Sequence, residues 1–320
     1  MLWSSLKKPI YAAAPMLDVT DDAFRQMITD CKKPSVLFTE FVSVDGLHNT
    51  IARPKLVKRY LRFHQSQRPI VAQLWGSNPL HFEYAAALIK DLGFDGIDIN
   101  MGCPDKSVVK SGGGAALITT PSIAKACLDA TRSGARDIPV SVKTRIGFNT
   151  IETTRWITQL SRMRPDAITI HGRTKKELSL VNAHWNEIKK GARIARQEGI
   201  VVLGNGDVTS MAQAKEYSER YSVDGIMIGR ALLGTPWFFK YETPDAVSSD
   251  SRIALMLAHA RLFEKRCGDI KNFAHIRKHL KGYLSDFHGA KELRAIIMKA
   301  QNARVLKKLV YDWEKNKKSN

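Results

Sequence analysis

The stretch Gly96-Ile-Asp-Ile-Asn-Met-Gly-Cys-Pro104, followed shortly by Gly112-Gly-Gly114, is the part of the chain least like ordinary packing material. Its β-branched residues predict a short buried strand. The later glycines allow backbone conformations that other residues avoid. The pattern therefore indicates a strand that ends in a working loop with Asn100 and Cys103, although a lone cysteine also fits an inert thiol.

Short apolar runs of the same kind recur on both sides of this stretch, with longer amphipathic segments between them. The runs that we predict to be strands lie near residues 10–14, 36–39, 70–74, 96–99, 140–143, 167–170, 201–203 and 225–228. The predicted helices span residues 21–29, 80–90, 121–132, 152–162, 185–196 and 211–221. This alternation predicts a closed parallel (β/α)8 barrel, the TIM barrel. An open doubly wound sheet is the alternative, but no GxGxxG motif follows the first strand.

The strand pattern stops at residues 241–250, a segment that contains proline, serine and aspartate. We interpret this segment as a linker between two domains. Residues 1–240 then form the barrel domain, and residues 251–320 form a smaller domain made only of helices. The helices predicted in that second domain span residues 253–267, 272–287 and 291–311.

The net charge of +19 is unevenly distributed along the chain. Residues 251–320 contain 17 lysines and arginines against 6 acidic residues, which is more than half of the excess. Such asymmetry predicts a polyanionic partner, most often a nucleic acid, with an anionic membrane surface as the lesser option. A solvated helical face rich in lysine is the simpler alternative.

The cysteines and the apolar runs restrict the class of protein further. Cys31, Cys103, Cys127 and Cys267 form no CxxC pair and no cluster with zinc spacing, so we expect no structural metal and a reducing, cytoplasmic environment. No apolar run approaches the roughly 18 residues that cross a bilayer. The first residues also lack the form of a secretion signal, so we expect no membrane association.

Polar or specially shaped residues stand at the end of every predicted strand. In a TIM barrel the loops after these ends build the active site. In chain order the residues are Pro15 with Met16, Glu40, Gln73, Asn100 with Cys103, Lys143 with Arg145, His171 with Arg173, Asn205 with Gly206, and Gly229 with Arg230. Each alone fits a structural role, such as a helix cap for Gln73 or a turn for Asn205-Gly206. Their presence at all eight ends indicates one shared site.

The last two loops have the composition of a phosphate site. Loops after strands seven and eight commonly bind phosphate in this fold. Glycine lets backbone N–H groups come close to the anion, and the Arg230 guanidinium adds a fork of donors. Lys143, Gln73 and His171 are then placed to meet the edge of a flat ring that bears carbonyl groups. A lysine at a flavin's pyrimidine edge stabilises the anion formed on reduction, so the pattern favours flavin mononucleotide (FMN) over a dinucleotide.

Several motifs in order give the chain a family resemblance. They are Ala14-Pro15-Met16, Phe38-Thr39-Glu40, Asp98-Ile-Asn-Met-Gly-Cys-Pro104, Lys110-Ser-Gly-Gly-Gly-Ala-Ala-Leu117, Lys143-Thr-Arg-Ile-Gly147, Ile170-His-Gly-Arg-Thr174, Gly204-Asn-Gly-Asp207 and Gly229-Arg-Ala231. Together they resemble the flavin-dependent tRNA-dihydrouridine synthases over nearly all of residues 9–240. The tail residues His275, Arg277, His279, Tyr283 and Gly289-Ala-Lys-Glu-Leu-Arg294 resemble that family's RNA-binding helical domain more loosely. One departure is Leu17-Asp18, where many members have smaller residues.

The resemblance implies reduction of the C5=C6 bond of a uridine in tRNA. Reduced FMN gives hydride to C6, Cys103 protonates C5, and NADPH or NADH is the reductant. A thiol suits this acid role because it is mostly protonated at neutral pH. Attack by the Cys103 thiolate is the rival role, but the sequence identifies no partner histidine for it.

The resemblance also assigns roles to the other residues. The cofactor would be held by Pro15, Met16, Gln73, Lys143, His171, Asn205, Gly206, Gly229 and Arg230. The substrate base and its phosphates would be contacted by Glu40, Asn100, Arg145 and Arg173. The target base must leave its stack to reach the flavin. The helical domain would meanwhile grip the tRNA body through Arg277, Lys278, Lys281 and Arg294.

Two other functions stay open at this point. One is a flavin barrel that reduces a free pyrimidine or enone, and the other is a tRNA-binding protein without catalysis. The basic tail argues against the first, and the combination of Cys103, Lys143 and His171 argues against the second. Nothing in the sequence demands a stable protein partner or more than a monomer.

Overall fold

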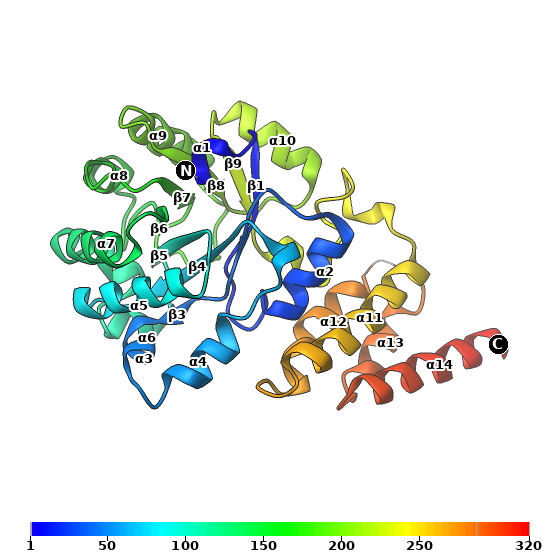
Figure 1. The fold of residues 1–320 in the computed structure, drawn as a ribbon. Coiled ribbons are helices and arrows are strands. Elements are labelled where there is room, and N and C mark those ends of the chain that lie inside the picture. The colour runs from blue at the N-terminus through cyan, green and yellow to red at the C-terminus, as the bar shows by residue number, and fades with distance from the viewer. Residues whose placement is uncertain (1, 286, 320) are drawn as a thin grey trace.

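A ring of parallel strands forms the centre of the computed structural model (Figure 1). The structure describes residues 2–285 and 287–319. Residues 1, 286 and 320, which fall in the predicted barrel domain, the predicted helix 272–287 and the predicted helical domain, lie outside the described residues. The strands are β1 (Ile10–Ala13), β2 (Leu37–Phe38), β3 (Val42–Ser43), β4 (Ile70–Trp75), β5 (Gly96–Met101), β6 (Val140–Arg145), β7 (Ala167–His171), β8 (Val201–Asn205) and β9 (Gly225–Ile228).

The strand order confirms the predicted barrel. Neighbours run β1-β9-β8-β7-β6-β5-β4-β2, and every pairing is parallel. One strand, β3, was not predicted. It pairs with the end of β4 through Val42 and Leu74. The eight strands predicted from the sequence make up the ring itself.

The ring closes between β1 and β2 at an isolated bridge from Ala12 to Val36. Two long hydrogen bonds mark this seam, at 3.4 Å from Ala13 N to Val36 O and 3.3 Å from Val36 N to Tyr11 O. The β5–β6 pair, by comparison, holds five residues in register. The seam is therefore the most weakly bonded junction of the ring.

Helices cover the outside of the ring. They are α1 (Leu2–Ser5), α2 (Asp22–Lys32), α3 (Val44–His48), α4 (Arg53–Tyr60), α5 (Pro79–Asp91), α6 (Lys106–Lys110), α7 (Pro121–Ala135), α8 (Thr153–Arg162), α9 (Trp185–Arg196) and α10 (Met211–Arg220). All the predicted helices of the barrel are present. Their starts follow local chemistry, because the side chain of Asn78 accepts from Leu80 N and that of Asp21 accepts from Phe24 N. The short helices α1, α3, α4 and α6 were not predicted.

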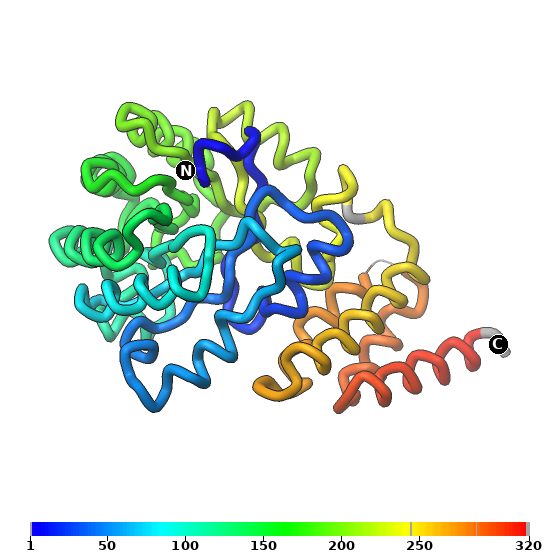
Figure 2. The backbone as a smooth tube through the Cα atoms, in the orientation of Figure 1, coloured from blue at the N-terminus to red at the C-terminus, as the bar shows by residue number. Residues whose placement is uncertain are grey.

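The chain continues after the barrel as a helical region beside α2 (Figure 2). Its helices are α11 (Ser249–Cys267), α12 (Arg277–Tyr283), α13 (Ala290–Ile297) and α14 (Ala303–Ser319). Short 3₁₀ turns occur at η1 (Gln65–Gln67), η2 (Gly114–Ile118), η3 (Arg230–Leu232), η4 (Pro244–Ala246) and η5 (Phe273–Ile276). The assignment of residues 241–250 as a domain linker stays a prediction.

The predictions of single helices over 272–287 and 291–311 were wrong. The first begins as the 3₁₀ turn η5 and ends at Tyr283, where arginine side chains bind the next carbonyls: Arg294 donates to Leu284 O and Arg252 to Ser285 O. The second is divided between α13 and α14. Asn302 begins α14 by accepting from Val305 N through its side chain.

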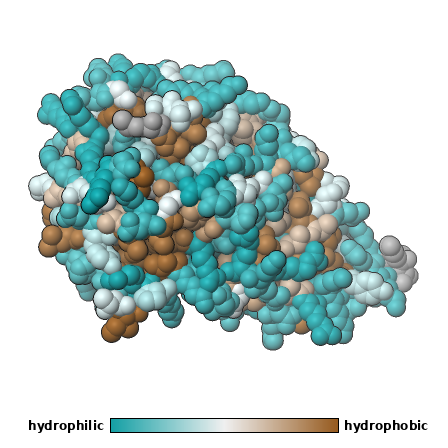
Figure 3. Space-filling model, in the orientation of Figure 1, coloured by the Kyte–Doolittle hydropathy of each residue, from teal (hydrophilic) through white to brown (hydrophobic). Residues whose placement is uncertain are grey.

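The helical region packs on α2 through an apolar and aromatic interface. The ring of Phe24 lies 4.1 Å from that of His279 and 5.3 Å from that of His259, measured between centroids. The outer edge, formed by α14, is mostly hydrophilic (Figure 3). Within residues 2–285 and 287–319, no helix is long and apolar enough to span a membrane.

Candidate active site at the C-terminal end of the barrel

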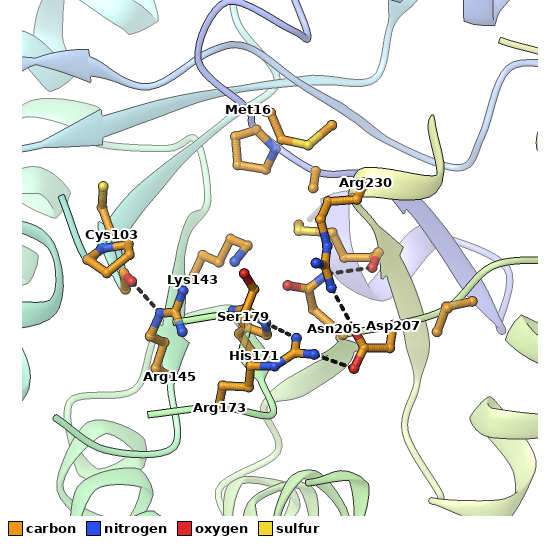
Figure 4. A pocket seen from close by; sticks show the side chains of 18 of the residues that line it. Met16, Cys103, Lys143, Arg145, His171, Arg173, Ser179, Asn205, Asp207 and Arg230 are labelled. Atoms are coloured by element: carbon orange, nitrogen blue, oxygen red, sulfur yellow. Dashed lines mark hydrogen bonds and ion pairs between the residues drawn. The ribbon is translucent and has the colours of Figure 1, made fainter. Parts of the chain in front are cut away.

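A cavity of about 840 Å³ opens at the C-terminal ends of the barrel strands (Figure 4). The predicted residues that line it are Pro15, Met16, Asn100, Cys103, Lys143, Arg145, His171, Arg173, Asn205, Gly206, Gly229 and Arg230. The sequence did not point to Phe41, Leu178 or Ser179, which also line it. The predicted residues of six strand ends thus meet at one site, the end of β2 reaches it only through Phe41, and Gln73 of β4 lies behind the cavity wall.

The loop that carries Cys103 is held from three sides. Asn100 Oδ1 accepts from Gly102 N at 3.1 Å and from Cys103 N at 2.8 Å. Arg145 Nε donates to Gly102 O at 2.7 Å. Behind the loop, a Cβ on Gly114, which has φ +57°, would lie 2.8 Å from Cys103 O. Only glycine fits there, so the glycine run serves to let the chain pass close behind the thiol.

The Cys103 thiol keeps its proton at neutral pH. Burial raises the pKa of this thiol, although Arg145 and Lys143 oppose the shift. Within the described residues no histidine is hydrogen-bonded to it. A protonated thiol at the edge of a cavity can donate a proton but is a poor nucleophile.

Lys143 and His171 form a half-buried wall of the cavity, and its positive charge comes from the Lys143 ammonium. Burial and the neighbouring Arg145 lower the pKa of Lys143 to about 8. Its ammonium has no hydrogen-bond or ion-pair partner among residues 2–285 and 287–319. Burial, then Lys143 and the nearby arginines, lower the pKa of His171 well below its ordinary value. Since Arg173 Nη1 lies 3.2 Å from His171 Nε2 and can only donate, the imidazole is neutral.

The side of the cavity that faces Cys103 is organised around Asp207 (Figure 4). Arg230 Nη2 lies 2.6 Å from Asp207 Oδ1, and Arg173 binds the other carboxylate oxygen. These arginines keep the pKa of Asp207 below its usual value although burial opposes them. The Arg230 side chain is still 61% exposed. Cys103 and this arginine pair thus lie on opposite sides, with Lys143 and His171 between them.

Two glycines lie near Arg230, one required by close packing and one beside open space. Gly206 has φ +139°, and a Cβ there would lie 2.6 Å from Ala183 Cβ. A Cβ on Gly229 would meet no atom closer than 3.9 Å, so space is open above its backbone. An exposed guanidinium beside accessible backbone is the chemistry that a phosphate group needs.

A hydrogen-bond relay runs behind the cavity wall to the Cys103 loop. Asn100 Nδ2 donates to Gln73 Oε1 at 3.0 Å, and Gln73 Nε2 donates to Asp98 Oδ2 at 2.7 Å. Ser141 Oγ donates to Asp98 Oδ1 at 2.6 Å. Burial raises the pKa of Asp98 to about 6. Asp98 was missed, although a carboxylate between two isoleucines of a predicted strand is a usable signal.

Glu40 lies outside the cavity, at the junction with the helical region. Its carboxylate is fully buried and lies 2.7 and 2.8 Å from Lys271 Nζ, whose side chain is also buried. It also accepts from Asp18 N at 2.6 Å. Burial raises the pKa of Glu40 to about 7 against the effect of Lys271. Burial would lower the pKa of Lys271, but the carboxylates of Glu40, Asp21 and Asp18 outweigh it.

The four tail residues predicted to contact substrate do not reach the cavity. Lys278 and Lys281 are exposed on α12. Arg277 donates to Ala300 O at 3.2 Å and Arg294 donates to Leu284 O at 2.6 Å, so both hold neighbouring segments together. The structure thus divides the four into two exposed lysines and two structural arginines.

The fold and this site define a TIM-barrel enzyme whose cavity combines a proton-bearing thiol with a cationic wall. A family model described as "Dihydrouridine synthase (Dus)" matches residues 12–318. The chain belongs to this family of oxidoreductases.

Individual relatives agree with the family assignment. A "Probable tRNA-dihydrouridine synthase" of Staphylococcus aureus (strain COL) is 35% identical over 322 residues, which cover 98% of this chain and 95% of the relative. A "Probable tRNA-dihydrouridine synthase 2" of Bacillus subtilis (strain 168) is 34% identical and covers 98% of this chain and 96% of its own. The solved structure of morphinone reductase is 12% identical, with a TM-score of 0.53 over 75% of this chain and 87% of its own, and so resembles it in fold alone.

Proposed function

We propose that the chain is a tRNA-dihydrouridine synthase that binds FMN and uses NADPH or NADH to reduce the C5=C6 bond of one uridine in tRNA. The observation that carries the proposal is the Cys103 thiol at the edge of a cavity with a cationic wall and a cationic far side. Membership of the dihydrouridine synthase family supports the substrate class.

The residues of the cavity fit FMN. Its phosphate matches the exposed guanidinium of Arg230 and the open space at Gly229, and Asn205 and Gly206 line the same cavity. Its ring matches the unpartnered Lys143 ammonium and the neutral His171, with Pro15 and Met16 on another wall. Gln73, which was predicted to bind the cofactor, does not line the cavity, so we assign it an indirect role through its hydrogen bond to Asn100. When bound and reduced by the nicotinamide, the flavin supplies the hydride.

Cys103 completes the reaction by giving its proton to C5 of the uracil. The raised pKa keeps this proton in place until the carbanionic carbon accepts it. Asn100, which fixes the loop, and the buried Arg145 and Arg173 line the same cavity and are proposed to face the base and its phosphates. For Glu40 we propose an indirect role, because it binds Lys271 rather than lining the cavity.

The exposed Lys278 and Lys281 are proposed to bind phosphates of the tRNA body. Arg277 and Arg294 would support them by holding the helices in place. We extend the proposal to a cytoplasmic monomer without a stable protein partner.

One experiment tests the function directly. The purified protein is examined for flavin absorption and then incubated with NADPH and unmodified tRNA, and dihydrouridine is quantified. We expect a yellow protein that forms dihydrouridine, and a Cys103→Ala variant that binds flavin but forms little product. The matched control is Cys31→Ala, a half-buried thiol on α2. A yellow protein that reduces free uracil but not tRNA would overturn the proposal, and a colourless tRNA-binding protein would favour the non-catalytic alternative.

A further inference from the structure

Exposed apolar side chains lie in two loops at the rim of the cavity. Leu178, Leu180 and Val181, in the loop after β7, are 43%, 82% and 41% exposed. Leu178 and Ser179 line the cavity itself. Leu17, which follows the lining residue Met16 after β1, is 40% exposed. We call these residues Leu17, Leu178, Leu180 and Val181 the apolar rim.

The loop that presents the apolar rim is held firmly. Arg145 Nη1 donates to Thr174 O at 2.9 Å and to Leu178 O at 3.2 Å. Arg173 Nε donates to Val181 O at 2.6 Å. Both arginines are buried in the cavity wall. The exposure of these apolar side chains is therefore imposed by the architecture of the site.

The backbone of this loop is held in an uncommon conformation at Leu178. Its φ of +53° is in the left-handed region, which a leucine rarely adopts. The next turn is closed by a bond of 2.9 Å from Leu180 N to Glu177 O. Backbone strain that the surroundings maintain is typical of functional segments.

Apolar groups kept in water next to a cavity indicate a partner that covers them. A nucleic acid presents apolar surface chiefly on the faces of its bases. Those faces become accessible where one nucleotide leaves the stack, and apolar side chains are used elsewhere to occupy such gaps. The next exposed side chain, Lys176, adds a positive charge that suits the phosphates alongside.

We propose that the apolar rim, and Leu180 above all, packs against the bases that flank the target uridine and stabilises the extruded form of the RNA. This inference rests on the proposed reduction of tRNA uridine. It assigns the loop after β7 a positioning role that is separate from the chemistry at Cys103.

The test compares Leu180→Ser with Leu180→Met, which keeps an apolar side chain of similar size. Leu92→Ser is the control, because Leu92 is 36% exposed at the C-terminal end of α5 and so at the opposite end of the barrel. The modified uridine is first mapped with the wild-type protein. A tRNA with 2-aminopurine next to that uridine then reports unstacking by its fluorescence.

We expect Leu180→Ser to lose most of the fluorescence rise and to slow single-turnover reduction of tRNA by roughly tenfold, the scale of one lost base contact. Reduction of the flavin by NADPH should stay unchanged, and Leu180→Met and Leu92→Ser should behave as wild type. A normal fluorescence rise and rate in Leu180→Ser, or an equal loss in Leu92→Ser, would overturn the role of the rim. A wild-type protein that makes no dihydrouridine would instead overturn the proposed function, and this inference with it.

Discussion

The protonation state of Cys103 decides which chemistry this residue performs. An acid acts only while it holds its proton, so its contribution is present below its pKa and is lost above it. Because burial raises the pKa of Cys103, the ratio of the wild-type rate of tRNA reduction to that of Cys103→Ala should stay level through the ordinary thiol value of 9.0 and fall only above it. Single-turnover oxidation of the reduced flavin by tRNA, followed from neutral to alkaline pH, measures this.

Removal of the thiol gives the magnitude of its contribution. We expect Cys103→Ala to slow the same step by about 10²-fold or more, the usual range for a positioned acid. A rate that rises with pH through the thiol range would instead show that the thiolate is the reactive form.

The pair of Lys143 and Asp98 predicts a second pH dependence. The Lys143 ammonium is charged below its pKa of about 8 and, on the proposed function, then stabilises the reduced flavin anion. Reduction of the flavin by NADPH should therefore become less favourable as the pH rises through about 8. Asp98→Asn removes the carboxylate that raises this pKa, so the transition should move to lower pH.

The flavin reduction potential, measured as a function of pH, checks this prediction. Lys143→Met serves as the control and should abolish the transition. An unchanged midpoint in Asp98→Asn would show that Asp98 acts only through its hydrogen bonds to Gln73 and Ser141.

The site residues that could be predicted from the sequence are those at or just after the ends of strands. Cys103, Lys143 and His171 follow or end strands, and parallel strands bring such ends together. Asp98 was missed although its position inside an apolar strand marks it. Lys271 was missed because its partner Glu40 lies 231 residues away in the sequence. Glu40 was expected to contact the substrate for the same reason, because its partner Lys271 lies far away in the sequence, in the helical region.

At the level of elements, the ion pair between Glu40 and Lys271 fastens the end of β2 to the segment between α11 and η5. Because both side chains are fully buried, Lys271→Met leaves a buried carboxylate without its partner, and we expect a loss of ~3–5 kcal/mol in the free energy of unfolding. Adding Glu40→Gln to this variant should restore part of the loss, because the isolated charge is then removed.

Urea denaturation measures this effect. The matched control is Lys58→Met, which breaks an exposed pair between Lys58 and Asp269 and should change the free energy of unfolding little. Equal losses in the two variants would contradict the assignment of Glu40 and Lys271 as the main link.

The elements of the barrel were predictable because hydrophobic runs, caps and turns are local signals. The breaks in the tail helices were not, since the carbonyls at the end of α12 are satisfied by Arg252 and Arg294 from other helices. Amphipathic periodicity continues across both breaks and therefore predicted longer helices than those present.

At the scale of the whole molecule, the excess positive charge should govern affinity for tRNA. Each phosphate contact that is removed flattens the dependence of log affinity on log salt concentration by about one. We expect a double replacement of Lys278 and Lys281 by alanine to reduce the slope by up to about two, measured by a filter-binding titration over salt.

A matched control lies at the other end of the barrel. Lys7, before β1, and Arg136, after α7, are also exposed. Their replacement should leave the slope unchanged. A slope that responds equally to both pairs would indicate a diffuse attraction rather than a binding surface at α12.

The seam at Ala12 and Val36 has a consequence for the motions of the barrel. With one bridge and two long hydrogen bonds, its amide protons should exchange with deuterated solvent faster than those between β5 and β6. The helical region packs on α2, the helix that leads from β1 to β2, and so restrains the opening of this seam. In Lys271→Met, deuterium uptake should therefore rise at Ala13 and Val36 while β6 stays protected, and a uniform rise would refute this. The helical region, which is proposed to bind RNA, would then also control how often the β1–β2 seam of the barrel opens.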